Sequence, residues 1–253
     1  MTLRLGLCSV TLRHLDVAGV LAAAVEAGLE CVEWGADVHV PAGDGAAAVR
    51  VRGATEEAGL AVASYGSYYR AGLTDPAEFD GVLRSAVLLG AARIRIWAGA
   101  TGTEEASAEE RAAVVEDTRR VAALAADVGV YLAYEFHRNT LTDGADRALR
   151  LLEEVGRPDV LTYWQPPLDV ADSDALVGLD AVIDQVAAVH AFSWWPGTSR
   201  RPLSVRSELW GAVFDRLRGL GGGGPLDVLL EFVPDDDEKI LVREARTLRG
   251  FGG

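Results

Sequence analysis

Short apolar runs alternate with amphipathic segments along nearly the whole chain, with a repeat of about 30 residues. Several of these runs are apolar on both faces, which is typical of parallel β-strands that are covered on both sides. We predict eight strands, at residues 3–10, 30–35, 60–66, 92–97, 130–136, 160–165, 187–194 and 227–233. The alternation therefore predicts repeated strand–helix units.

The segments between the apolar runs carry the start and stop signals of helices. Asp16 and Asp75 are predicted N-caps, and Ser107 with Glu110 has the spacing of a capping box. Glycine follows several of these segments, where it can adopt the left-handed conformation that ends a helix. These glycines are Gly90, Gly129 and Gly156.

Eight strand–helix units in 253 residues predict an α/β fold, a (β/α)8 TIM barrel, with residues 1–253 as a single domain. An open, doubly wound sheet is the alternative, but no predicted strand is followed by a G-x-G-x-x-G turn. The glycine run 221–224 precedes a strand, so we interpret it as a flexible loop and not as a phosphate-binding loop.

Composition and charge narrow the function and the location. The formal net charge of −14 argues against binding to duplex nucleic acid or to an anionic membrane surface. Cys8 and Cys31 lie in apolar runs and are expected to be buried free thiols in a reducing compartment. The first residues do not form a signal peptide, and no apolar stretch approaches the roughly 18 residues of a membrane span. We expect a soluble, cytoplasmic protein.

Polar and aromatic residues gather where the predicted strands end, which is where a barrel carries its active site. All four histidines and five of the six tryptophans fall near these positions. This clustering predicts an aromatic-walled pocket at one mouth of the barrel. Packing of the tryptophans around the barrel rim is the structural alternative.

Four of these residues form a set that suits a metal ion. Glu135, Gln165, His190 and Glu231 lie on four consecutive strands, near the same end of each. Two carboxylates, an imidazole and an amide oxygen can bind one divalent cation, such as Mn²⁺, Mg²⁺, Co²⁺ or Zn²⁺. The alternative is four separate polar residues, each satisfied by hydrogen bonds within the barrel.

The chain resembles the xylose-isomerase-like barrel superfamily, the group of sugar phosphate isomerases and epimerases. The resemblance is carried by "CVEWGADVHVP", "RIRIWAG", "YEFHRNTLTD", "VHAFSWWPG" and "LLEFV". It implies one metal bound by Glu, Asp, His and Glu, which here are Glu135, Gln165, His190 and Glu231. It also implies that Glu135 and Glu231 transfer the protons. Two positions depart from the family: Gln165 replaces Asp, and Leu168 stands where its sugar epimerases tend to carry a His.

We therefore expect a metal-dependent isomerase or epimerase that acts on a sugar, cyclitol or related polyhydroxy carbonyl compound through an enediolate. Glu135 and Glu231 are the expected catalytic residues. Glu33, His39, Trp97 and His137 are the expected substrate contacts, with pairing to Arg95 as the structural alternative for Glu33. A small-molecule partner is expected, and a homodimer is left open.

Three other functions remain as alternatives at this point. A lyase or dehydratase would use the same metal and enolate but would expel a β leaving group. A retaining glycosidase would need Glu135 and Glu231 about 5–5.5 Å apart with no metal between them. A non-catalytic binding protein or partner subunit would have Gln165 as the mark of a decayed metal site.

Overall fold

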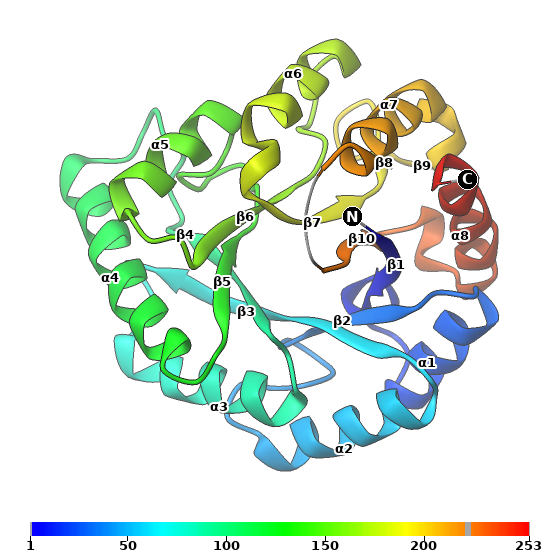
Figure 1. Cartoon of the computed structure of the whole chain (residues 1–253), viewed down its shortest axis with the longest axis horizontal. Coiled ribbons are helices and arrows are strands. Elements are labelled where there is room, and N and C mark those ends of the chain that lie inside the picture. Colours follow the sequence, from blue (N-terminus) through cyan, green and yellow to red (C-terminus); the bar gives the residue numbers. More distant parts are fainter. Residues whose placement is uncertain (1, 221–223, 253) are drawn as a thin grey trace.

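The computed structural model describes residues 2–220 and 224–252, and these residues form a closed barrel of parallel strands surrounded by helices (Figure 1). The strand order around the barrel is β1-β10-β7-β6-β5-β4-β3-β2. The strands are β1 (Leu3–Cys8), β2 (Cys31–Gly35), β3 (Ala61–Ala71), β4 (Arg93–Ala98), β5 (Tyr131–Tyr134), β6 (Val160–Trp164), β7 (Val186–Ala191) and β10 (Leu226–Leu230). This confirms the (β/α)8 barrel, and the alternative of an open sheet is wrong.

The helices lie outside the barrel in chain order. They are α1 (Val17–Glu26), α2 (Gly45–Glu57), α3 (Phe79–Leu89), α4 (Ala108–Ala126), α5 (Ala145–Val155), α6 (Asp172–Val182), α7 (Ser207–Arg218) and α8 (Glu238–Gly252). Asp16 caps α1, and Ser107 with Glu110 forms the predicted capping box of α4. Gly90 and Gly156 end α3 and α5 in the left-handed conformation. The local signals in the sequence therefore mark real helix ends.

Several predicted strand ends are wrong. The strands expected at 3–10, 130–136 and 227–233 end earlier, at Cys8, Tyr134 and Leu230. The strand expected at 60–66 continues to Ala71, because Tyr65, Tyr69 and Ala71 keep burying side chains beyond the polar Ser67. The strand expected at 187–194 ends at Ala191, and the chain then forms a short antiparallel hairpin of β8 (Ser193–Trp194) and β9 (Arg200–Arg201). The predicted flexible loop at 221–224 has three of its four residues outside the described part of the chain.

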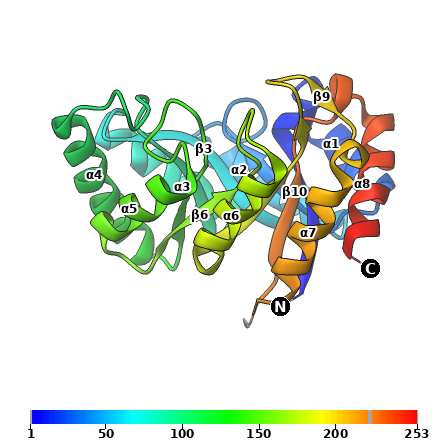
Figure 2. The ribbon, with the colours of Figure 1, turned by 90° about the horizontal axis from the view of Figure 1, so that it is seen from above.

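The strands separate two packed regions. Side chains on the outer face, such as Leu7, Val32 and Ile94, pack against the helices in the main core. A smaller cluster fills the barrel interior, with Cys8, Ala133 and Tyr163 among its members. In Figure 2 the amino-terminal end lies at the lower edge of the molecule and β9, which follows β7, lies at the upper edge. The upper edge is therefore the carboxyl end of the barrel strands.

The barrel interior also contains a layer of buried charge near its amino-terminal end. Arg93 donates hydrogen bonds to Asp227 (2.9 Å), to the Tyr163 hydroxyl (2.8 Å) and to the Ala187 carbonyl (2.8 Å). Arg4 donates to the other oxygen of Asp227 at 2.7 Å. Because every charge in this layer has a partner, the layer closes the lower half of the barrel without the cost of an unpaired buried ion.

Gly6 lies in the barrel wall at a close approach between β1 and its neighbours. A Cβ at this position would lie 2.5 Å from Cys31 Sγ and 2.7 Å from Leu229 Cδ2. We expect Gly6→Ala to destabilise the protein by about 1–3 kcal/mol and to lower Tm by several degrees in a thermal melt. Gly53→Ala is the control, because nothing lies within 4 Å of the Cβ it would add. Equal melting temperatures for the two variants would contradict this account of Gly6.

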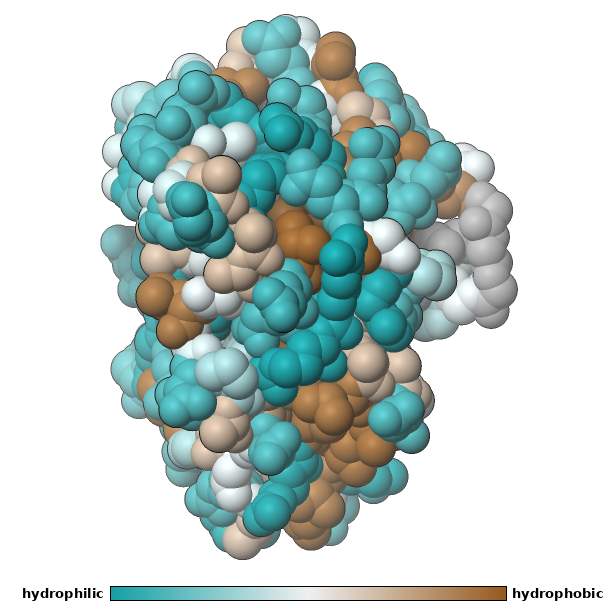
Figure 3. Space-filling view, turned by 90° about the vertical axis from the view of Figure 1, so that its left-hand side faces the viewer, coloured by the Kyte–Doolittle hydropathy of each residue, from teal (hydrophilic) through white to brown (hydrophobic). Residues whose placement is uncertain are grey.

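The outer surface is mainly polar on the side that carries α4. Figure 3 shows this face, where hydrophilic residues predominate and smaller apolar patches interrupt them. Within residues 2–220 and 224–252, the structure contains no helix that combines the length and apolar character needed to span a bilayer.

Candidate active site

A cavity of about 630 Å³ opens at the carboxyl end of the barrel. Its floor includes Glu135, Gln165 and Glu231, which directly follow β5, β6 and β10. Its walls include the aromatic residues Tyr68, Trp97, Phe136, Phe192, Trp194 and Phe232. A concave, largely apolar pocket with a few converging polar groups is the usual form of a small-molecule site.

The aromatic wall contains fewer tryptophans than the sequence indicates. Trp97 and Trp194 line the cavity, but Trp34 and Trp164 are fully buried between the sheet and the helices. Trp195 is 40% exposed and is not part of the lining. The expected tryptophan cluster is therefore wrong for these three residues. Trp34 and Trp164 lie on the outward faces of their strands, because neighbouring side chains of a strand point to opposite faces, and Trp195 lies in the turn after β8.

Two of the predicted metal ligands, Gln165 and Glu231, lie close to a third, His190. His190 Nδ1 lies 3.1 Å from Gln165 Oε1 and 3.3 Å from Glu231 Oε2. Two atoms bound to the same cation at about 2.0–2.2 Å, with roughly a right angle between them, would lie about 3 Å apart. These three side chains thus have the spacing and the donor types that a divalent cation requires.

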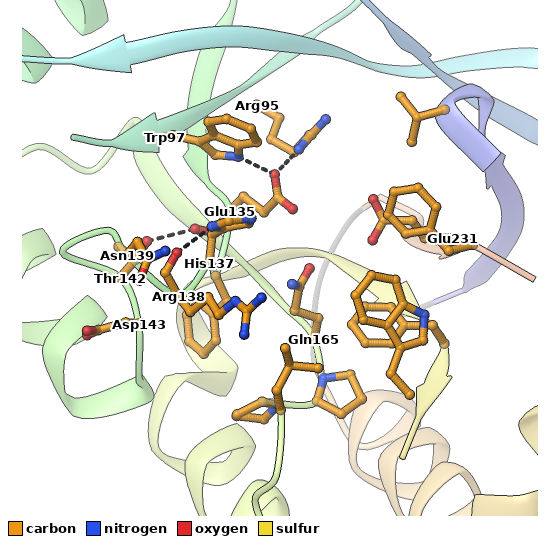
Figure 4. Close-up of a pocket in the computed structure, with 18 of the residues that line it drawn as sticks. Arg95, Trp97, Glu135, His137, Arg138, Asn139, Thr142, Asp143, Gln165 and Glu231 are labelled. Carbon is orange, nitrogen blue, oxygen red and sulfur yellow. Dashed lines mark hydrogen bonds and ion pairs between the residues drawn. The ribbon is translucent and has the colours of Figure 1, made fainter. Parts of the chain in front are cut away.

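Glu135, the fourth predicted ligand, has a different set of contacts. Its Oε2 accepts a hydrogen bond from the Trp97 indole N–H and forms an ion pair with Arg95, as Figure 4 shows. In the same view Glu231 lies across the cavity from Glu135, with Gln165 below them. The structure therefore brings all four residues to one pocket, with Glu135 turned toward Arg95 and Trp97.

Glu33 lies beneath this floor and connects the two halves of the site. Its Oε1 is 3.0 Å from Arg95 Nε and 3.5 Å from His190 Nε2, while its Oε2 accepts hydrogen bonds from Ser64 (2.6 Å) and Tyr163 (2.7 Å). Burial acts to raise the pKa of Glu33, but the charge of Arg95 together with the contacts to His190 and Ser64 outweighs it and holds the pKa well below its usual range. Glu33 is thus an ionised partner of Arg95, which was the structural alternative for this residue.

His190 is fully buried, and its Nε2 has no hydrogen-bond partner among the described residues. This nitrogen faces the Glu33 carboxylate, and Nδ1 faces Gln165 and Glu231. A histidine that binds metal through one nitrogen commonly directs the other N–H toward a carboxylate, which fixes the tautomer. The donor set and this orphaned nitrogen both fit a metal held through Nδ1.

Cys8 is a neighbour of the site that sequence reasoning did not identify. Cys8, His190 and Glu231 each offer an atom, all lying within 4.8 Å of one another. Burial raises the pKa of the Cys8 thiol to about 12, so the thiol keeps its proton at neutral pH and contacts Glu33 Oε1 at 3.7 Å. Cys8 ends β1 and lies two residues beyond Gly6, which faces the barrel interior. The period of two along a strand therefore predicts that Cys8 also points inward, and this could have identified it from the sequence.

The predicted substrate contacts fall into two groups. Trp97 and His137 line the cavity, and their rings lie 5.1 Å apart. His39 does not line it: its ring nitrogens lie 3.1 Å from Ser9 Oγ and 3.1 Å from the Leu15 carbonyl. Glu33 is buried below the floor. Trp97 and His137 are therefore placed to touch a bound molecule, and His39 and Glu33 are placed to support the site.

The loop after β5 presents His137 in a defined form. His137 Nδ1 lies 2.5 Å from the Arg138 carbonyl, so this nitrogen carries the proton and Nε2 is the acceptor. Burial lowers the pKa of His137, which favours the neutral ring at pH 7. The loop thus offers a neutral imidazole beside the cavity floor.

The chain belongs to the Xylose isomerase-like TIM barrel family, whose family model matches residues 21–249. A 3-dehydroshikimate dehydratase of Bacillus anthracis is 37% identical over 87 residues, a segment that covers 32% of this chain and 31% of that relative.

Solved structures share the fold over almost the full chain. The probable 3-DHS dehydratase AsbF of B. anthracis matches with a TM-score of 0.80 and 20% identity, covering 98% of this chain and 99% of that one. An L-ribulose 3-epimerase matches with a TM-score of 0.75 and 19% identity, covering 99% and 94%. A D-psicose 3-epimerase matches with a TM-score of 0.73 and 16% identity, covering 99% and 100%. The matched proteins thus carry names of two reaction types, epimerisation and dehydration.

Proposed function

We propose that this protein is a divalent-metal-dependent isomerase or epimerase of a small polyhydroxy carbonyl compound. The observation that supports this most directly is the arrangement of Glu135 and Glu231 on opposite sides of one cavity, with Gln165 and His190 between them in strand order (Figure 4). Glu135, Gln165, His190 and Glu231 would hold the metal. When bound, the cation would supply positive charge for the negative charge that develops on the substrate's carbonyl oxygen.

The side chains of the site divide the remaining work. One of Glu135 and Glu231 would remove the proton next to the carbonyl, and the other would return a proton to the opposite face or to the neighbouring carbon. Arg95 and Trp97 would orient the Glu135 carboxylate through the contacts described above. The neutral His137 would contact a substrate hydroxyl through Nε2.

A dehydratase is the second candidate, and the 37% identity to a 3-dehydroshikimate dehydratase over 87 residues favours it. It would share the first step, removal of a proton next to a carbonyl. The reaction would then end with loss of a β-hydroxyl as water, for which Glu231 or His137 could deliver the proton. Leu168 stands where sugar epimerases of this family tend to carry a histidine, so one expected substrate contact of a ketose 3-epimerase is absent, which favours the dehydratase.

We expect the purified protein to contain about one divalent metal per chain by elemental analysis. A chelator should lower Tm by several degrees and Mn²⁺ should restore it, because a ligand that binds only the folded state stabilises that state. Proton NMR in D₂O, with D-psicose and 3-dehydroshikimate as trial substrates, should show exchange next to the carbonyl. Exchange without loss of water indicates the isomerase, and loss of water indicates the dehydratase. A protein that binds no metal and catalyses no exchange would contradict both.

A further inference from the structure

Arg138 is an arginine at the cavity whose side chain has no partner in the part of the chain that the structure describes. It follows β5, lines the cavity and is exposed. Figure 4 shows its guanidinium group pointing toward the middle of the pocket, on the side of Gln165. Among residues 2–220 and 224–252, no carboxylate lies within 4.0 Å of this group, and its side chain makes no hydrogen bond to the protein.

The two other arginines that line the cavity, Arg13 and Arg95, are paired with acids, and so is Arg200 on the β8–β9 hairpin. Arg13 pairs with Asp37 at 2.5 Å, Arg95 pairs with Glu33 at 3.0 Å, and Arg200 pairs with Asp236 at 2.5 Å. In an acidic chain of net charge −14, an unpaired guanidinium inside a cavity is therefore an exception.

The acids that line the cavity near Arg138 have other partners. Asp143 accepts hydrogen bonds from the backbone N–H and the hydroxyl of Thr103 (3.0 and 2.8 Å), and Asp169 accepts one from the Gly197 N–H at 2.8 Å. These contacts hold both carboxylates in place. The Arg138 guanidinium is thus left available to a ligand.

The loop that carries Arg138 is fixed by its own hydrogen bonds. Thr140 Oγ1 donates to the His137 carbonyl at 2.6 Å, and Thr142 Oγ1 donates to the Glu135 carbonyl at 2.7 Å. His137 Nδ1 donates to the Arg138 carbonyl. A fixed backbone limits the positions that the side chain can sample, which lowers the entropy lost when it binds a ligand.

We propose that Arg138 binds a carboxylate of the substrate, so that the site acts on a hydroxylated keto acid. A guanidinium is a planar fork of N–H donors that matches the two oxygens of a carboxylate. A phosphate group fits less well, because it carries more negative charge and would share the cavity with Glu135, Glu231 and Asp169. The carboxylate would bind at Arg138 while oxygens elsewhere on the molecule meet the floor at Gln165 and Glu231.

This inference rests on the proposed metal-containing pocket, and it holds for both candidate reactions. It can be tested without turnover by isothermal titration calorimetry of the Mn²⁺-loaded protein with two probes. 3,4-Dihydroxybenzoate has adjacent oxygens for the metal and a carboxylate for Arg138. 3,4-Dihydroxybenzamide has the same ring and oxygens but no charge.

We expect the benzoate to bind the native protein about 10- to 100-fold more tightly than the benzamide, the range typical of a charge-assisted pair. Arg138→Met should remove this preference and leave the affinity for the benzamide within about twofold, and Arg138→Lys should keep part of it. Arg200→Met is the control: it removes the same charge from an arginine that already has a partner, Asp236, and should keep the preference. A thermal melt checks that each variant folds.

Equal affinity of the native protein for the two probes would overturn the carboxylate site and leave the metal pocket standing. A preference that survives Arg138→Met would also overturn it. Failure of both probes to bind the Mn²⁺-loaded protein would overturn the inference together with the proposed function.

Discussion

Replacing Arg95 with methionine should destabilise the protein by about 3–5 kcal/mol, the cost of leaving buried charges without their partner. Arg95 is 3% exposed and pairs with both Glu33 and Glu135, which are also buried. A methionine side chain fills much of the same volume but leaves two carboxylates facing apolar surroundings. Urea unfolding monitored by circular dichroism measures the loss directly, and Tm should fall by about 6–20 °C for a chain of this size.

The loss of stability caused by Arg95→Met should become smaller as the pH falls. In the native protein Arg95 helps to hold the pKa of Glu33 below the ordinary value of 4.5. The ionised Glu33 therefore stabilises the folded state above pH 4.5, and this stabilisation is lost as the pH falls and Glu33 takes up a proton. The difference in the free energy of unfolding between the native protein and Arg95→Met should therefore become smaller below about pH 4.5.

Arg52→Met is the matched control for Arg95. Arg52 pairs with Glu56 at 2.8 Å on the surface of α2, where both side chains are at least half exposed, and exposed pairs contribute about 0–1 kcal/mol. If Arg95→Met unfolds at the same urea concentration as Arg52→Met, the buried ion pairs do not stabilise the barrel as described.

Replacing Glu231 with glutamine should reduce turnover about 10²- to 10⁴-fold, the usual contribution of a positioned general base. The same change removes one negative charge from the proposed ligand set, so Mn²⁺ should bind about 100-fold more weakly or worse. Metal binding is measured by calorimetry, and turnover is measured on whichever trial substrate shows exchange. The two readouts together separate loss of the base from a general loss of fold.

Glu238→Gln serves as the control for Glu231. Glu238 lies at the start of α8, is 46% exposed and sits 3.7 Å from His14. Its replacement changes the net charge by the same amount without touching the cavity. Unchanged Mn²⁺ affinity in Glu231→Gln would argue against Glu231 as a ligand, and unchanged turnover would argue against it as the proton carrier.

The sequence predicts the fold because its signals are local and repeated. Strand β4 shows this well: in "RIRIWA" the isoleucines pack outward and Arg93, Arg95 and Trp97 point inward, as the period of two requires. The strand ends are less predictable, because β3 continues through polar residues and β7 turns into a hairpin. These features depend on contacts with other strands, which a local pattern does not contain.

The candidate site is predictable only in part. Strand order explains why Glu135, Gln165, His190 and Glu231 meet at one mouth. The contacts among their side chains do not follow from strand order: the sequence gives no sign that Glu135 turns toward Arg95 and Trp97. Arg138 stands in the same stretch as Glu135, yet its lack of a partner among residues 2–220 and 224–252 is visible only in three dimensions.

The buried layer around Arg93 and Asp227 affects how small molecules enter and leave the cavity. Because paired side chains seal the lower half of the barrel, reactant and product must share the upper opening. A product that keeps the groups recognised at the rim would leave slowly and compete with the next molecule for entry. Under the proposed function, inhibition by accumulated product is therefore expected, whichever compound is converted.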